Sequence, residues 1–374
     1  MAASDELLTA RFNQDASCVA VGTRRGYQLF TCAPFASQHS SADGGVAVIE
    51  MLFSSSLVAL VSAGERPGDS PRRLRLWNTR SNTSICDLNF STAVLAVRMN
   101  KARLIAALET KLHFFELSTM KLLHTLETAP NPRGLVELSA EADSCHCALP
   151  AGQPEGQALL FDAANLCALN TVQAHRSKLA AMALSPRGEL LATASEKGTV
   201  IRVHTFPQGG LAHTFRRGSM PATISSLAFS PGVLVGGMRE ASAVLLAAAS
   251  TTGTVHVWRL DAQRGGGDGG APPDVARSAS GAVSAAVGGA ASRLPLVSGE
   301  RDFASVKLAV PAGATCHAAL HDGRTNEAVS GDMTLRHSLY VWTDAGAWYA
   351  YSLDPLRGGE CALVDEQRLV SAAR

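Results

Sequence analysis

Two adjacent arginines, Arg216 and Arg217, are the residues of this sequence with the clearest capacity for chemistry. They lie in the run Phe215-Arg216-Arg217-Gly218, and the stretch 199–204 before it alternates in polarity as a β-strand does. Successive side chains of a strand point to opposite faces, so adjacent arginines serve different pockets. A guanidinium carries a permanent charge and a planar fork of donors that suits phosphate. The pair predicts anion sites on both sides of one strand; the alternative is an exposed edge strand with solvated charges.

Two neighbouring segments add small hydroxyl groups, a glycine turn and basic residues. Residues 193–202 read TASEKGTVIR, and residues 250–258 read STTGTVHVW. Both have the pattern of a strand, a turn and a second strand. Hydroxyl groups give short hydrogen bonds to a phosphate, and Gly198 lets a ligand approach the backbone closely. Thr254 and His256 are two positions apart and therefore share one face of a strand.

No catalytic or metal-binding constellation accompanies these segments. The sequence contains no G-x-S-x-G, G-x-x-x-x-G-K-[ST] or H-E-x-x-H motif. Cys145-His146-Cys147 is a close grouping, but a strand would place the thiols and the imidazole on opposite faces, and no second ligand pair follows at zinc spacing. The eight cysteines are scattered, mostly within apolar runs, which indicates reduced thiols in a cytosolic protein. We therefore expect no metal, no cofactor and no enzymatic activity.

Composition narrows the class of protein further. The chain has 374 residues, 46% of them hydrophobic, which is enough for a sizeable core. Its formal net charge is only +1, so we expect no nucleic-acid partner, and any anion site must be a local cluster. No apolar run is long enough to span a bilayer, and the N-terminal residues lack the pattern of a signal peptide.

Short alternating apolar runs recur along the chain, separated by turns rich in Gly, Asp, Ser and Pro. A period of about forty to fifty residues in such an all-β pattern predicts a propeller. We count seven units, at 7–43, 46–90, 94–126, 134–172, 178–217, 224–310 and 316–364. The first shows only three strands clearly, whereas most others contain four of their own. We expect closure by packing of the first blade on the last, and no linker supports the alternative of two β-sandwiches.

The ordered motifs resemble those of the PROPPIN family, the WIPI-type β-propellers that bind phosphoinositides. FRRG is the signature of that family, and the segments at 193–202 and 250–258 match those that supply its other lipid contacts. Further matches include FNQD at 12–15, GYQLF at 26–30, DFA at 302–304 and LDP at 353–355. The resemblance implies a seven-bladed β-propeller of WD-repeat type as a single domain over residues 1–374.

The resemblance also implies two lipid-binding sites on the rim, for phosphatidylinositol 3-phosphate and phosphatidylinositol 3,5-bisphosphate. The first would consist of His175, Thr193, Ser195, Gly198, Thr199, Arg202 and Arg216. The second would consist of Arg217, Ser250, Thr254 and His256. Two weak sites on one rigid body raise membrane affinity through effective concentration.

Residues 261–300 interrupt the pattern with a segment rich in Gly, Ala and Ser that cannot bury enough apolar area to fold alone. The corresponding PROPPIN loop, in the sixth blade, enters the bilayer. Here its apolar residues include Val283, Val287, Leu294 and Leu296. The alternative is an inert linker. Residues 231–242 and 325–336 are two shorter departures from the repeat.

PROPPINs act in autophagosome formation and endolysosomal traffic, where they recruit other autophagy proteins. The resemblance implies a monomer that is cytoplasmic and peripheral on preautophagosomal, endosomal or vacuolar membranes. Asn13 and Asp15 match positions used for a lipid-transfer partner, the basic segment 65–75 is a further candidate, and Arg98 and Arg103 could meet an acidic helix of a conjugation scaffold. The competing function is a propeller that binds only proteins, for which loss of the arginine pair or the hydroxyls would be expected.

Overall fold

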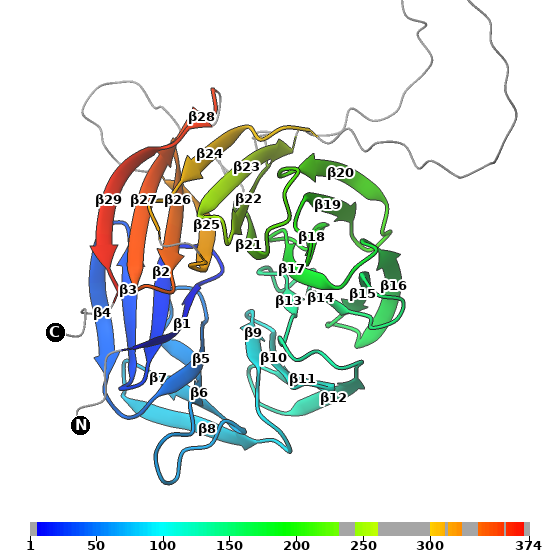
Figure 1. The fold of residues 1–374 in the computed structure, drawn as a ribbon. Helices are drawn as coiled ribbons and strands as arrows, with labels where there is room; N and C mark the ends of the chain where they lie inside the picture. The colour runs from blue at the N-terminus through cyan, green and yellow to red at the C-terminus, as the bar shows by residue number, and fades with distance from the viewer. Residues whose placement is uncertain are drawn as a thin grey trace, which may run out of the picture.

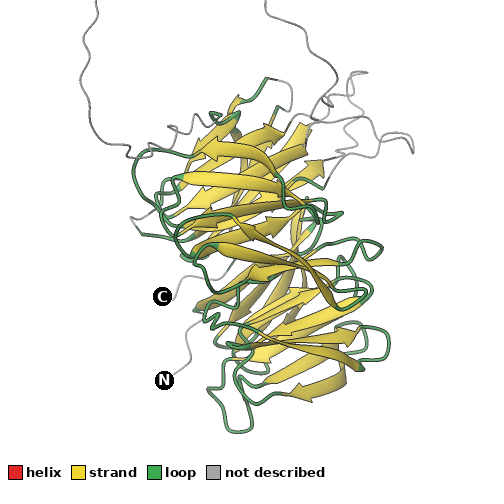
Figure 2. Ribbon diagram, turned by 90° about the vertical axis from the view of Figure 1, so that its right-hand side faces the viewer, coloured by secondary structure: helices red, strands yellow, loops and turns green. Residues whose placement is uncertain are grey.

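The computed structural model describes residues 6–231, 244–260, 300–310, 313–323, 336–354 and 357–369, and these form a seven-bladed β-propeller. The blades surround a central axis (Figure 1), and Figure 2 shows them from the side, built from strands joined by loops. The predicted fold class is confirmed. Within the described residues, no helix is long and apolar enough to cross a bilayer.

The first four blades are antiparallel sheets of four consecutive strands each, with β1, β5, β9 and β13 innermost. Blade 1 contains β1 (Leu7–Phe12), β2 (Cys18–Thr23), β3 (Tyr27–Cys32) and β4 (Phe35–Ser41). Blade 2 contains β5 (Val46–Met51), β6 (Leu57–Ser62), β7 (Arg73–Asn78) and β8 (Thr83–Asn89). Blade 3 contains β9 (Ala96–Met99), β10 (Arg103–Ala107), β11 (Lys111–Glu116) and β12 (Leu122–Glu127). Blade 4 contains β13 (Glu137–Leu138), β14 (His146–Pro150), β15 (Gln157–Asp162) and β16 (Cys167–Gln173).

The last three blades carry the candidate lipid sites and the ring closure. Blade 5 contains β17 (Leu179–Leu184), β18 (Leu190–Ser195), β19 (Val200–Thr205) and β20 (Leu211–Arg216). Blade 6 contains β21 (Ile224–Phe229), β22 (Val244–Ser250), β23 (Thr254–Leu260) and β24 (Ala304–Lys307), and β28 (Gly359–Glu360) pairs with β24 in parallel. Blade 7 contains β25 (Cys316–Gly323), β26 (Arg336–Thr343), β27 (Ala347–Leu353) and β29 (Ala362–Arg368).

Blade 1, in which the sequence shows only three strands clearly, has a fourth strand, β4. Its sequence, FASQHSS, is mostly polar, and its side chains are exposed or half-buried. An outermost strand has little apolar surface to cover, so its sequence lacks the pattern by which the inner strands were found. The described residues leave out most of 231–242, 261–300 and 325–336, so the predictions for those segments lie outside the structure.

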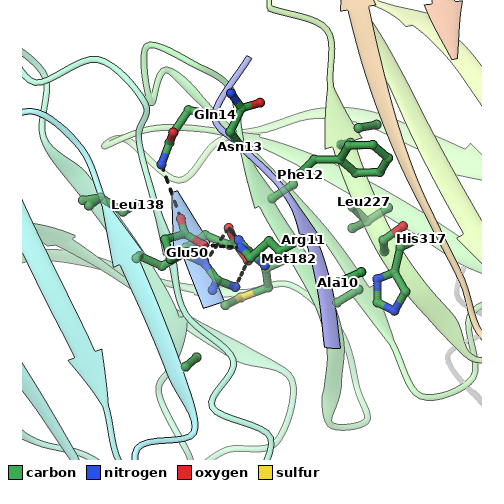
Figure 3. Close-up of a pocket in the computed structure, with 18 of the residues that line it drawn as sticks. Ala10, Arg11, Phe12, Asn13, Gln14, Glu50, Leu138, Met182, Leu227 and His317 are labelled. Carbon is green, nitrogen blue, oxygen red and sulfur yellow. Dashed lines mark hydrogen bonds and ion pairs between the residues drawn. The ribbon is translucent and has the colours of Figure 1, made fainter. Parts of the chain in front are cut away.

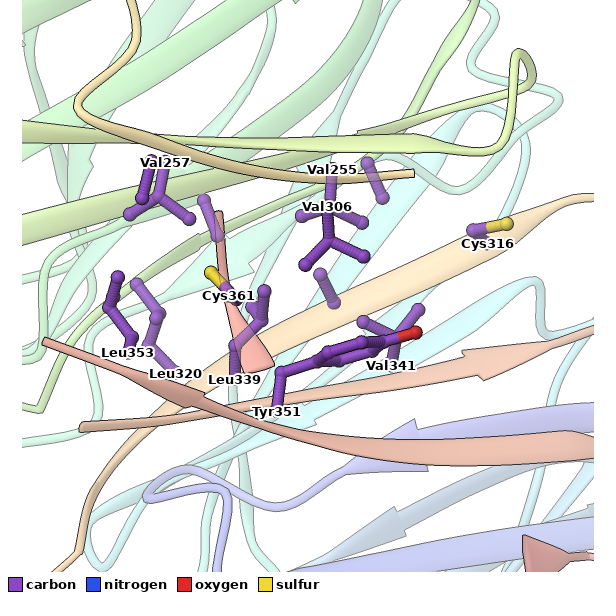
Figure 4. Packing of buried hydrophobic residues seen from close by; sticks show 14 of the residues in the cluster. Val255, Val257, Val306, Cys316, Leu320, Leu339, Val341, Tyr351, Leu353 and Cys361 are labelled. Carbon is purple, nitrogen blue, oxygen red and sulfur yellow. The ribbon is translucent and has the colours of Figure 1, made fainter. Parts of the chain in front are cut away.

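The core of the propeller lies between blades rather than within them. Figure 4 shows the contact of blades 6 and 7, where Val255 and Val306 face Leu320 and Leu339. Cys316 lies in the same cluster, and burial raises the pKa of its thiol to about 11. Such a thiol is protonated at neutral pH, as expected of an inert core cysteine.

Blades 1 and 7 close the ring by packing side by side, as the sequence predicts. Val19 and Phe30 of blade 1 share one buried cluster with Trp342 and Trp348 of blade 7. The rings of Phe35 and Trp348 lie 4.4 Å apart between centroids. Each of the two sheets consists of its own strands, so aromatic packing and not an exchanged strand holds the closure.

Candidate functional site

The register of blade 5 places the two arginines on different sides of the sheet. Arg216 is opposite Val200 on the neighbouring strand β19, and Phe215 is opposite Ile201. Phe215 and Ile201 belong to the buried cluster shared with blade 6. Since alternate residues face opposite ways, Arg216 points toward blade 4. Arg217 extends beyond the strand and donates to the carbonyls of Gly198, at 2.7 Å, and Met220.

A pocket of about 520 Å³ lies on the side of blade 5 that faces blade 4. It is bounded by β16, by the turn after it, and by β19 and the start of β20, and both His175 and Arg202 line it. Arg202 also donates to the carbonyl of Ala174. This region, the blade 4–5 pocket, therefore brings together two of the residues predicted for the first site.

His175 is held in the pocket by a neighbour from the same predicted site. Its Nε2 lies 3.1 Å from Oγ1 of Thr193, which in turn donates to the Arg202 carbonyl at 3.3 Å. Burial, and then the charge of Arg202, lower the pKa of His175 to about 4, so the ring is neutral at physiological pH. Thr193 is fully buried, and its described contacts orient His175 rather than face solvent.

The other predicted residues of the first site lie around the turn between β18 and β19. Ser195 is buried and Thr199 is half-buried. Gly198 has a φ of 58°, and a Cβ there would lie 1.8 Å from the Ala222 carbonyl oxygen. A glycine is therefore required at this position by the backbone of the connection to blade 6, independently of any ligand.

Three of the predicted residues of the second site, Ser250, Thr254 and His256, lie on the side of blade 6 that faces blade 5. His256 and Thr254 share the face of β23 that carries Trp258, and the rings of His256 and Trp258 lie 5.7 Å apart. Ser250 is buried, and its hydroxyl contacts Thr252 and the Thr254 carbonyl. The same side of blade 6 packs against the face of blade 5 that carries Phe215.

A short segment at residues 300–303 joins the outer strands of blades 5 and 6, a contact that the sequence did not predict. The Glu300 carbonyl accepts from the backbone amide of Arg216 at 3.2 Å, while the Phe303 amide donates to Val257 at 2.8 Å. Between them, Asp302 Oδ2 lies 2.9 Å from Nδ1 of His256. The predicted histidine of the second site thus has a carboxylate partner from a segment 46 residues away in sequence.

Comparison with known proteins decides the family of this propeller. The PROPPIN family model matches residues 6–370, nearly the whole chain. The chain belongs to the PROPPIN family. Autophagy-related protein 18 of Dictyostelium discoideum is 38% identical over 377 residues, covering 98% of this chain and 94% of that protein. Autophagy-related protein 18 of Yarrowia lipolytica is 35% identical over 416 residues, covering 98% of this chain and 97% of that protein.

Two solved PROPPIN-like structures share the fold. Kluyveromyces lactis Hsv2 has a TM-score of 0.69 at 18% identity, covering 98% of this chain and all of that one. A complex of KlAtg21 with the coiled-coil of AgAtg16 gives a TM-score of 0.68 at 26% identity, covering 97% of this chain and 99% of that one. These matches make the present chain an autophagy-related PROPPIN propeller.

The PROPPIN residues predicted to bind a protein partner make intramolecular contacts. Asn13 is 6% exposed, and its amide group bonds to Ser17 and to the backbone of Cys18. Asp15 accepts from the Ser17 hydroxyl at 2.6 Å. Arg103 Nε donates to the Ala163 carbonyl at 2.8 Å and so ties blade 3 to blade 4. In the structure, these side chains therefore stabilise a turn of blade 1 and the contact between blades 3 and 4.

The central channel of this PROPPIN is a cavity of about 560 Å³ lined by the inner strands of the blades. The fold brings two carboxylates to this channel. Glu50 lies 2.6 Å from Arg11 (Figure 3), and Glu137 lies 2.9 Å from Arg98. Burial raises the pKa of Glu50 while the Arg11 charge opposes that rise. Among the described residues no group of three metal-ligating side chains occurs.

Proposed function

We propose that this PROPPIN is a non-enzymatic phosphoinositide effector that recruits autophagy proteins to membranes during autophagosome formation. Its ligands are phosphatidylinositol 3-phosphate and phosphatidylinositol 3,5-bisphosphate, bound at two rim sites beside Arg216 and Arg217. The observation that carries the proposal is the position of these arginines, which leave the end of β20 toward two different inter-blade surfaces. Each surface also contains a histidine and hydroxyl groups that suit phosphate oxygens.

Charge supports the first site in particular. The side chains that line the blade 4–5 pocket include Arg202 and Arg176 and, among the described residues, no carboxylate. A local excess of positive charge on a chain with a net charge of +1 is a specific feature of this surface. It favours an anionic ligand over a neutral one.

The residues around Arg217 indicate which side of the molecule would face the membrane. Met220, whose carbonyl accepts from Arg217, is 74% exposed. An apolar side chain beside a headgroup site can enter the interfacial region of a bilayer. The segment 261–300, with Val283, Val287, Leu294 and Leu296, is proposed as a second insertion element, although it lies outside the described residues.

Partner recruitment is the second half of the proposal. The complex of KlAtg21 with the coiled-coil of AgAtg16 supports a helical conjugation scaffold as one kind of partner, and a lipid-transfer protein is another. The propeller acts as a monomer, cytoplasmic and peripheral on preautophagosomal, endosomal or vacuolar membranes. Two headgroup sites on one rigid body make membrane recruitment depend on lipid density.

A liposome flotation assay tests this function. Full-length protein is mixed with liposomes of a neutral carrier lipid to which phosphatidylinositol, phosphatidylinositol 3-phosphate or the 3,5-bisphosphate has been added. We expect flotation only with the 3-phosphorylated lipids. Equal flotation with unphosphorylated phosphatidylinositol would refute the proposed specificity, and no flotation with any of them would favour a propeller that binds only proteins.

A further inference from the structure

The blade 4–5 pocket extends beyond the residues that sequence reasoning assigned to the first site. Besides His175 and Arg202, its wall includes Arg176 and His204, which the sequence analysis did not assign. Arg202 and His204 are two residues apart on β19 and face the same way, so their Cα atoms are about 6.6 Å apart along the strand. Val200, opposite Arg216, lies the same distance from Arg202 on its other side. Arg202 is therefore the middle of a row with Arg216 at one end and His204 at the other.

The charges in this part of the pocket are unbalanced. Burial, and then the nearby charge of Arg176, lower the pKa of Arg202, which means that the two guanidinium groups repel each other. Arg176 is exposed, and no carboxylate side chain lines the pocket beside it among the described residues. An anion bound in the cavity would offset the repulsion between these two positive charges.

His204 adds a buried imidazole at the far end of the row. The residue is only 4% exposed; its ring lies against the backbone of Gly209, and neither ring nitrogen has a hydrogen bond of good geometry among the described residues. Burial lowers the pKa of His204, so the ring is neutral and carries one N–H donor and one acceptor nitrogen. A buried polar group without a partner is costly, and a ligand oxygen in the pocket would satisfy it.

We propose that Arg176 and His204 form a second phosphate position in the blade 4–5 pocket, so that the first site prefers a headgroup with two ring phosphates over one with a single phosphate. One phosphate lies between Arg216 and Arg202, and the second lies between Arg202, Arg176 and His204. The inference rests on the proposed function, because it assumes that the pocket takes an inositol phosphate. A volume of about 520 Å³ is large enough for such a ring.

The test measures the first site alone, with Arg217→Thr in every protein to silence the second. Isothermal titration uses short-chain phosphatidylinositol 3-phosphate, the 3,5-bisphosphate and the 3,4-bisphosphate. We expect Arg176→Gln to weaken the preferred bisphosphate about tenfold and the monophosphate less than twofold, since it removes one charge-assisted contact. Arg80→Gln is the matched control, because Arg80 is an exposed arginine of blade 2 and the charge change is the same.

The outcomes separate the inference from the function beneath it. Equal weakening of mono- and bisphosphates by Arg176→Gln, or no weakening of either, would overturn the second phosphate position while leaving lipid binding intact. Failure of the parent protein to bind any 3-phosphorylated headgroup would instead refute the proposed function. His204→Gln provides an independent reading: loss of bisphosphate preference with an unchanged unfolding temperature supports the inference, and an unchanged preference in that folded variant contradicts it.

Discussion

Replacing Arg216 and Arg217 singly with threonine should affect stability differently, although the two residues are adjacent. Arg216 is exposed, and its described hydrogen bond is made by the backbone. Arg217 is half-buried and donates from its guanidinium to two backbone carbonyls, those of Gly198 and Met220. Each such bond contributes roughly 1 kcal/mol net, so Arg217→Thr should cost about 2 kcal/mol and Arg216→Thr close to none. In a protein of this size that loss lowers the unfolding temperature by about 2–4 °C.

The same two variants should behave alike toward soluble headgroups. Because the arginines serve different sides of blade 5, each single change leaves one site working, and the stoichiometry of headgroup binding should fall by about half. On liposomes each single variant should lose much more than half of its binding, because two linked sites multiply their affinities. The double variant should not bind, and wild-type binding should weaken as salt is raised.

Isothermal titration with a short-chain 3-phosphorylated lipid, thermal unfolding and flotation are measured on the same preparations. Loss of both sites in either folded single variant would refute the argument from strand alternation, even if lipid binding itself were correct. An unfolding temperature lowered as much by Arg216→Thr as by Arg217→Thr would show that the carbonyl contacts of Arg217 are not what stabilises this turn.

Four further changes have defined outcomes. Deletion of 265–292 should leave the unfolding temperature unchanged and weaken liposome binding but not binding of a soluble headgroup; a large loss of stability would contradict its reading as a loop. Met220→Gln should reduce flotation severalfold at constant headgroup affinity, and equal flotation would remove Met220 from the membrane side. Replacing Asn13 and Asp15 with alanine should lower the free energy of unfolding by about 1–2 kcal/mol, because their side chains hold a turn. A pull-down normalised to the amount of folded protein then tests whether they have a role in partner recruitment. The free energy of unfolding should fall as the pH drops from about 6.5 to 4, because the pKa of His175 is about 4 in the folded protein and the unfolded chain binds more protons in that range. Urea unfolding at a series of pH values should show a weaker pH dependence for His175→Gln.

The sequence predicted those features that depend on local periodicity. Alternation placed Phe215 and Arg216 on opposite faces of β20, and the register of the sheet agrees. The strand β4 was missed because an outermost polar strand has no apolar alternation to detect. Local pattern also could not distinguish a hydroxyl that faces solvent from one that is buried, as Thr193 and Ser250 are.

The parts of the candidate site that the sequence did not predict depend on contacts between segments that are far apart in sequence. Asp302 reaches His256 because β24 pairs with β23, although the two residues are 46 positions apart in sequence. The pairing of Glu50 with Arg11 likewise depends on the inner strands of two blades meeting at the channel. Such pairs leave no signature in a single sequence, since neither residue type nor spacing specifies the partner.

The side-by-side closure of blades 1 and 7 has a consequence for biosynthesis. Val19, Val21 and Phe30 form an apolar face of blade 1 whose partners include Trp342 and Trp348 of blade 7. A ribosome that adds 5–20 residues per second makes those partners roughly 300 residues later, after about 15–60 s. During that interval the nascent first blade displays an uncovered apolar surface, which is the kind of surface that chaperones bind. Once blade 7 has been synthesised and packs on blade 1, this surface is buried and no longer needs a chaperone.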